Sequence, residues 1–260
     1  MSDFNSVIDI VYQAGQNLKK HFGNVEVLGY KTTHFDTATP SDVVTKLDQE
    51  TENFLESNLK KIDPTIGFTG EESGVIKKSD RFWLADPIDG TGFFLRGIWG
   101  CTMMLILIED GQQKFSAIYD FIQDKMYTAE DGKGAYLNKK RIKVSKRHLN
   151  EAFVYIESHS AKIYSALAEK CTNLGNYPAG IHFALAAEGK VEGRICVDPY
   201  GKDYDFAPGQ LLVKEAGGIV KNIGKDSFDY TDLNFLAVNK EVYEELTQGP
   251  DAVFPINLSL

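Results

Sequence analysis

The chain has 260 residues, enough for a substantial buried core in one compact unit or in two closely joined lobes. Its formal net charge of -9 argues against a surface for nucleic acid or for anionic membranes, so we expect neither as a partner. An acidic protein can still bind phosphate where bound metal ions reverse the local charge.

The N-terminal residues lack the basic start and the unbroken apolar stretch of a signal peptide. The longest apolar run, Cys101 to Ile108, is far shorter than the roughly 20 residues that a membrane helix needs. It predicts a buried strand instead. We therefore expect a cytoplasmic protein with no membrane partner.

Periodicity along the first half of the chain predicts helices and strands. Apolar residues at helical spacing predict an amphipathic helix from about Val7 to Gly23, and another over residues 47–59. The strands expected in this half lie at residues 67–69, 82–85, 103–109, 114–119 and 125–129. The last three are joined by short turns and should form an antiparallel meander.

The second half continues with mixed elements. We expect strands at 153–157 and 194–197, and helices at 162–171, at 179–187 and from Tyr204 to Gly217. The sequence contains no internal repeat and no Pro/Ser-rich linker. Two rigidly packed lobes, residues 1–145 and 146–260, are therefore predicted, and the periodicity supports a mixed α+β fold.

The most informative motif is Asp86-Pro87-Ile88-Asp89-Gly90-Thr91, which follows an apolar strand pattern. Asp86 and Asp89 offer the hard oxygen ligands that Mg²⁺ prefers, and the Ile88 carbonyl can supply another. Gly90 permits close backbone approach, and the amides from Thr91 onward could cradle a phosphate if a helix begins there. The alternative is a solvated turn, which Asp, Pro and Gly also favour.

Other acidic motifs favour a metal site over a turn. Gly70-Glu71-Glu72-Ser73 follows a short apolar stretch, and Tyr204-Asp205-Phe206-Ala207 opens a helical pattern. Ser41-Asp42-Val43-Val44-Thr45 precedes a further amphipathic helix. Several carboxylates therefore stand where loops leave apolar segments.

In this order, these motifs resemble the inositol monophosphatase family, Mg²⁺-dependent and lithium-sensitive phosphatases that share a fold with fructose-1,6-bisphosphatase. The resemblance runs from the first helix to about residue 240 and includes the Glu-Ala-Gly-Gly that ends at Gly218. It implies a layered α-β-α-β-α sandwich, a phosphoric monoester hydrolase and a cytoplasmic homodimer. The partner is then a small phosphorylated substrate.

The resemblance also implies roles for individual residues. Two to three Mg²⁺ ions would be held by Glu71, Asp86, the Ile88 carbonyl, Asp89 and Asp205, with Glu72 in the outer shell. Thr91 and Asp42 match the pair that orients and deprotonates the attacking water. Asp42 could instead cap the following helix, and Thr45 and Asp48 are expected to support that helix and its loop.

Phosphate and substrate contacts are expected from Gly90, Thr91, Tyr177, Ala179 and Asp198. Here the chain departs from the family pattern: Phe93 stands where the family has Asn, and Tyr177-Pro178 replaces small residues. The predicted substrate is inositol monophosphate. Fructose 1,6-bisphosphate, a 3'-phosphoadenosine nucleotide and histidinol phosphate remain alternatives, as does a catalytically silent metal- and phosphate-binding regulatory protein.

Overall fold

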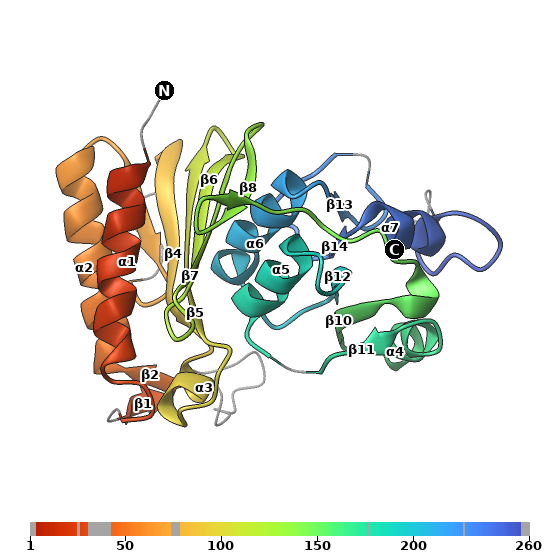
Figure 1. Ribbon diagram of the computed structural model, residues 1–260, viewed down its shortest axis with the longest axis horizontal. Coiled ribbons are helices and arrows are strands. Elements are labelled where there is room, and N and C mark those ends of the chain that lie inside the picture. The colour runs from red at the N-terminus through yellow and green to blue at the C-terminus, as the bar shows by residue number, and fades with distance from the viewer. Residues whose placement is uncertain are drawn as a thin grey trace.

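The computed structural model describes residues 4–24, 27–30, 43–73, 79–175, 177–225 and 227–255, and only the backbone of residues 27–30, 43 and 44. These residues form successive layers: two helices, a sheet, two central helices, a second sheet and two outer helices (Figure 1). The predicted layered α-β-α-β-α arrangement is confirmed.

The first sheet has seven strands in the order β3-β4-β5-β6-β7-β8-β9. Its strands are β3 (Gly67–Gly70), β4 (Arg81–Asp89), β5 (Thr102–Glu109), β6 (Gln112–Asp120), β7 (Lys125–Glu130), β8 (Gly134–Leu137) and β9 (Lys140–Arg141). Helices α1 (Asn5–Lys19) and α2 (Lys46–Ile62) cover one face of it (Figure 1). A two-stranded ribbon of β1 (Val27–Tyr30) and β2 (Val43–Thr45) lies below them, near the short helix α3 (Thr91–Leu95).

Strand β5 shows why this sheet is buried on both faces. Met103, Leu105 and Leu107 belong to the core formed with α1 and α2. The alternate residues Met104, Ile106 and Ile108 belong to the core on the opposite face. Successive side chains of a strand point to opposite faces, so an unbroken apolar run fits a strand between two helical layers.

The second sheet has five strands in the order β11-β10-β12-β14-β13. They are β10 (Phe153–Ser158), β11 (Thr172–Asn173), β12 (Gly193–Val197), β13 (Ile219–Asn222) and β14 (Phe235–Val238), and the 3-10 turn Leu149–Glu151 precedes β10. Helices α4 (Ala161–Ala168) and α7 (Lys240–Thr247) lie on its outer side (Figure 1).

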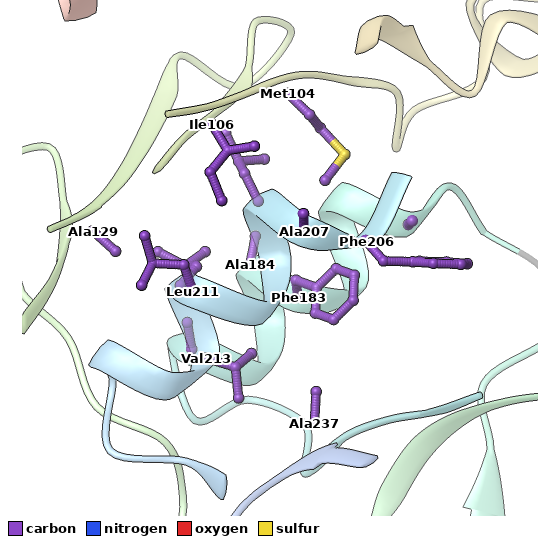
Figure 2. Close-up of a cluster of buried hydrophobic side chains, with 14 of the residues drawn as sticks. Met104, Ile106, Ala129, Phe183, Ala184, Phe206, Ala207, Leu211, Val213 and Ala237 are labelled. Atoms are coloured by element: carbon purple, nitrogen blue, oxygen red, sulfur yellow. The ribbon is translucent and has the colours of Figure 1, made fainter. Parts of the chain in front are cut away.

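Helices α5 (Ala179–Ala187) and α6 (Asp203–Glu215) form the layer between the sheets. Figure 2 shows Phe183 and Ala184 of α5 beside Phe206 and Leu211 of α6, between strand residues such as Ile106 and Ala237. Nearly every residue of α5 is buried. A helix that is apolar on all sides is suited to such a position because it meets protein in every direction.

The directions of parallel strands help to determine where polar groups gather. Strand β3 pairs in parallel with β4, and β10 pairs in parallel with β12. Each pair directs two carboxyl ends to one edge of its sheet, the usual place for a ligand site in such sheets. Acidic residues lie at these ends: Glu71 follows β3, Glu157 is the last residue but one of β10, and Asp198 follows β12.

The helices and strands expected from periodicity are confirmed within the described ranges, and none of them changes type. Strands β13 and β14 and helix α7 are among the elements that were not predicted. Strand β4 continues through Asp89, so Asp86 and Asp89 lie within the strand rather than after it. Within the same ranges, no helix combines the length and the apolar character needed to cross a membrane.

Close packing of the two central helices leads to a prediction for Gly209→Ala. A Cβ atom on Gly209 would overlap the ring of Phe183. We expect a loss of about 1–3 kcal/mol in the free energy of unfolding, measured by urea denaturation, because overpacking outweighs the better helix propensity of alanine. Adding Phe183→Leu should recover part of the loss. Strictly additive effects of the two substitutions would contradict this explanation.

Candidate active site

Three carboxylates from distant parts of the chain meet at one place. Asp86, Asp89 and Asp205 each offer an oxygen atom, and these atoms all lie within 4.8 Å of one another. Asp86 and Asp89 are buried in β4, and Asp205 lies half-buried in the first turn of α6. Such a set of oxygen donors could hold a divalent cation.

The backbone of β4 explains how two residues three apart can share the cluster. In a regular strand they would point to opposite faces. The pairing of β4 with β5 is irregular between Asp86 and Asp89, where Pro87 and Ile88 lie. The Ile88 amide donates to Asp86 Oδ1 at 3.0 Å, which fixes the carboxylate within this irregularity.

Asp89 is held by groups from the second half of the chain. The Ala179 amide donates to Oδ1 at 2.9 Å, and the Gly180 amide donates to Oδ2 at 2.7 Å. The Thr102 hydroxyl also donates to Oδ2, at 2.8 Å. The first amides of α5 thus face a carboxylate, as the helix dipole favours.

Asp205 is placed by the start of α6. Its Oδ2 accepts the Lys202 amide at 2.5 Å, at the residue that caps the helix. A carboxylate in the first turn is stabilised by the unpaired amides and the dipole of the helix. The second half of the chain therefore contributes one of the three clustered carboxylates.

Glu71 lies beside the cluster and forms a hydrogen bond with Asp86, although it is not one of the three clustered carboxylates. Its loop is held by Glu52 of α2, whose carboxylate accepts the amides of Glu72 and Ser73, each at 2.8 Å. Gly70 has no room for a side chain because Glu52 fills that space. The buried Glu52 therefore fixes the segment that carries Glu71.

Burial and crowding raise the pKa values of these carboxyl groups in the metal-free protein. Burial is the largest cause: it raises the pKa of Asp86 well above its ordinary value, and repulsion from Glu71 adds to it. Burial and Glu71 likewise raise the pKa of Asp205. Burial also raises the pKa of Asp89, but the amides of α5 and the Thr102 hydroxyl oppose it, so this pKa is about 6.

Thr91 stands beside the cluster, in the first turn of α3. Its hydroxyl oxygen lies 3.1 Å from Asp48 Oδ1 and 3.0 Å from the Ile88 carbonyl. Asp48 is fully buried, and its Oδ2 accepts both the amide and the hydroxyl of Thr45. Asp42, the predicted partner of Thr91, lies outside the described residues, so that assignment stays a prediction.

Asp48 is therefore a candidate that sequence reasoning placed only in a supporting role. The Thr45-x-x-Asp48 spacing is that of a capping box, and the structure contains this box. The cap accounts for one carboxylate oxygen and leaves the other to Thr91, 43 residues further along the chain. The sequence signal for the cap was present, whereas the contact with Thr91 depends on the tertiary fold.

The structure describes all of the residues expected to contact phosphate or substrate. Tyr177 is 42% exposed and packs near Phe93 and Trp99, with ring centroids 5.5 and 6.2 Å from its own. Gly90 has a φ of 82°, and a Cβ there would overlap Pro178. Asp198 is exposed at the end of β12. Their roles in binding remain predictions.

Comparisons with known proteins agree over almost the entire chain. A sequence model of the inositol monophosphatase family matches residues 3–249. The fructose-1,6-bisphosphatase/inositol-1-monophosphatase of Thermotoga maritima is 28% identical over 251 residues, 93% of each protein. The inositol-1-monophosphatase of Rhizobium meliloti is 30% identical over 227 residues, 82% of this chain and 83% of that protein. The structure of the Thermotoga maritima IMPase aligns with a TM-score of 0.82 and 27% identity over 95% of both chains. The chain therefore belongs to the inositol monophosphatase family and is a phosphoric monoester hydrolase.

Proposed function

We propose that the protein hydrolyses the phosphate monoester of a small polyol or sugar in a Mg²⁺-dependent reaction, with inositol monophosphate as the first candidate substrate. The observation that carries this proposal is the cluster of Asp86, Asp89 and Asp205 beside the hydroxyl of Thr91. The cluster supplies ligands for metal, and the hydroxyl supplies a group that can orient water.

The donor set favours Mg²⁺ because every candidate ligand is an oxygen atom. Two to three ions would be held by Glu71, Asp86, the Ile88 carbonyl, Asp89 and Asp205, with Glu72 in the outer shell. When bound, such ions neutralise the phosphate and stabilise the charge that develops on the attacking and leaving oxygens. The high pKa values of the metal-free carboxyl groups fit a site arranged for added positive charge.

Thr91 and Asp48 can move the proton of the attacking water. The Thr91 hydroxyl has one hydrogen and two acceptors, Asp48 Oδ1 and the Ile88 carbonyl. When it donates to Asp48, its oxygen is available to accept a hydrogen bond from water. The water proton then passes to Thr91 while the Thr91 proton passes to Asp48, which acts as the general base. Thr45 holds the other oxygen of Asp48 and so fixes its orientation.

The residues that sequence analysis assigns to phosphate and substrate define the proposed substrate pocket. Gly90 and Thr91 would meet the phosphate, and Tyr177, Ala179 and Asp198 would meet the leaving group. The relative from Thermotoga maritima is named for both fructose 1,6-bisphosphate and inositol 1-phosphate hydrolysis. This supports a sugar or cyclitol phosphate, with the bisphosphate as the alternative.

Other parts of the proposal rest on the family resemblance. We propose a cytoplasmic homodimer that is inhibited by lithium. The division into lobes at residues 145 and 146 also stays a proposal, in which most metal ligands belong to the first lobe and Asp205 belongs to the second.

The first test is phosphate release by the purified protein with Mg²⁺. Inositol 1-phosphate, fructose 1,6-bisphosphate, 3'-phosphoadenosine 5'-phosphate and histidinol phosphate are the substrates. We expect turnover of inositol 1-phosphate and a loss of at least about 100-fold in Asp89→Asn, because a carboxylate that would hold metal is neutralised. Mg²⁺ binding without turnover of any of the four would instead support an untested substrate or the regulatory alternative.

Asp86→Asn tests the effect of crowded carboxylates on stability. Folding raises the pKa of Asp86, so the folded metal-free protein holds a proton that the unfolded chain releases near pH 4. The free energy of unfolding therefore falls as the pH rises above about 4. At pH 7 without metal, Asp86→Asn should be more stable than the wild type, by about 1.4 kcal/mol for each pH unit from about 4 up to the folded pKa or to pH 7, whichever is lower. The difference should vanish near pH 4.

With Mg²⁺ at pH 7, the wild type should become more stable to thermal denaturation than Asp86→Asn. The wild type gains stability by binding the ion, whereas Asp86→Asn gains little. Asp9→Asn, on the far side of the first sheet in α1, is the matched control and should behave as the wild type in both conditions. Equal stabilisation of Asp86→Asn and the wild type by Mg²⁺ would argue against a metal site at Asp86.

Thr91→Val tests the proton pathway because it removes the hydroxyl and keeps the shape of the side chain. We expect kcat to fall by about 10²–10⁴ with Mg²⁺ binding preserved, and Thr91→Ser to retain most of the activity. Asp48→Asn and Asp42→Asn then separate the two candidate bases. A larger loss of kcat in Asp42→Asn than in Asp48→Asn would favour the assignment made from sequence.

A further inference from the structure

A buried ion pair lies between the parallel strands β10 and β12. Arg194 is 3% exposed and pairs with the carboxylate of Glu157 near the carboxyl end of β10. Tyr155 stands opposite Arg194 in the strand pairing, and the guanidinium lies over the Tyr155 ring, 4.1 Å from its centroid. A cation placed this deeply in protein needs a compensating negative charge.

The other neighbours of Arg194 fix its position without neutralising it. Its Nε donates to Cys196 Sγ at 3.2 Å, and Nη1 lies 3.4 Å from His182 Nδ1. A guanidinium can only donate, so this histidine nitrogen accepts. Burial and the Arg194 charge lower the pKa of His182 well below its ordinary value, which keeps the ring neutral. Among the described residues, Glu157 is the carboxylate paired with Arg194.

Glu157 uses its second oxygen on the loop that precedes α6. While Oε2 faces Arg194, Oε1 accepts the backbone amide of Tyr200 at 2.9 Å. Tyr200 lies between β12 and α6, and the Lys202 amide two residues later donates to Asp205 Oδ2. Gly201 of the same loop has no room for a side chain beside the ring of Phe206. One side chain therefore connects Arg194 to the loop that delivers Asp205.

We propose that Glu157, oriented by Arg194, is a positioning residue for Asp205 and thereby determines how tightly the site binds its divalent cation. This inference rests on the proposed function, since it takes Asp205 as a metal ligand. On this proposal, the Glu157–Arg194 ion pair contributes to metal affinity as well as to the stability of the fold. Groups that orient a metal ligand commonly change metal affinity by about 10- to 100-fold when they are replaced.

Glu157→Gln in the full chain is the direct test. An amide side chain has one acceptor oxygen where a carboxylate has two, so glutamine cannot serve both Arg194 and the Tyr200 amide. Binding of Mg²⁺ and of Mn²⁺ to the metal-free protein is measured by calorimetry. We expect affinity to fall about 10- to 100-fold at the site that Asp205→Asn also weakens.

The chain offers a closely matched control in Glu192. Its Oε1 pairs with Arg147 Nη2 at 2.6 Å, and its Oε2 accepts the backbone amide of Phe153 at 2.7 Å. It lies at the amino end of β12, about 16 Å along the strand from the carboxyl end. Glu192→Gln should lower the melting temperature and leave metal affinity unchanged.

A second variant removes the Tyr200 amide and leaves both members of the Glu157–Arg194 ion pair in place. Tyr200→Pro removes the N–H that Glu157 accepts, and Tyr200→Ala controls for the loss of the ring that packs on His159. Tyr200→Pro should weaken metal binding as Glu157→Gln does. If Glu157→Gln fails to fold, Tyr200→Pro decides the question alone.

The outcomes separate this inference from the proposed function. If the wild type binds neither ion, the proposed function fails and the inference fails with it. If the wild type binds while Glu157→Gln and Tyr200→Pro bind equally well, only the inference is overturned. Equal weakening by Glu192→Gln would also overturn it, because general softening of the sheet would then explain the effect.

Discussion

Electrostatic repulsion among carboxylates is the constraint on which the rest of the site depends. Asp86, Asp89 and Asp205 place oxygen atoms within 4.8 Å of one another, with Glu71 in contact. In water such groups would separate, and burial makes their charges more costly still. The fold must therefore hold each of them against this repulsion until positive charge arrives.

Each acidic group is held by a different element, and the supports come from both halves of the chain. Glu52 in α2 holds the segment of Glu71, and the first amides of α5 hold Asp89. The cap of α6 holds Asp205, and Glu157 binds the loop before that cap. Buried carboxylates thus serve in two ways here, as candidate ligands and as acceptors that fix the backbone beside those ligands.

The elements follow from sequence wherever a local pattern determines them. The unbroken apolar run from Cys101 to Ile108 predicts a buried strand, and the structure shows that both faces of β5 are covered. The motif from Asp86 to Thr91 contains two members of the carboxylate cluster. Asp48 was placed in a supporting role because its capping box explains it locally, whereas its contact with Thr91 depends on the fold. Strands β13 and β14 are four residues each, as β3 is, but no acidic motif like Gly70-Glu71-Glu72-Ser73 follows them to mark where a strand ends. The roles of Glu52 and Glu157 likewise depend on contacts that no sequence window contains.

The position of Asp89 between the two halves limits how they can move. Its carboxylate belongs to the first sheet, yet both oxygens accept amides from α5, and one core joins that sheet to α5 and α6. Any opening between the halves would break these hydrogen bonds and expose apolar surface, while also separating Asp205 from Asp86 and Asp89. The supports that hold the carboxylates together therefore also hold the layers together. Under the proposed function, selection of the substrate would then rest with side chains near the cluster, such as Tyr177, rather than with closure of one half on the other.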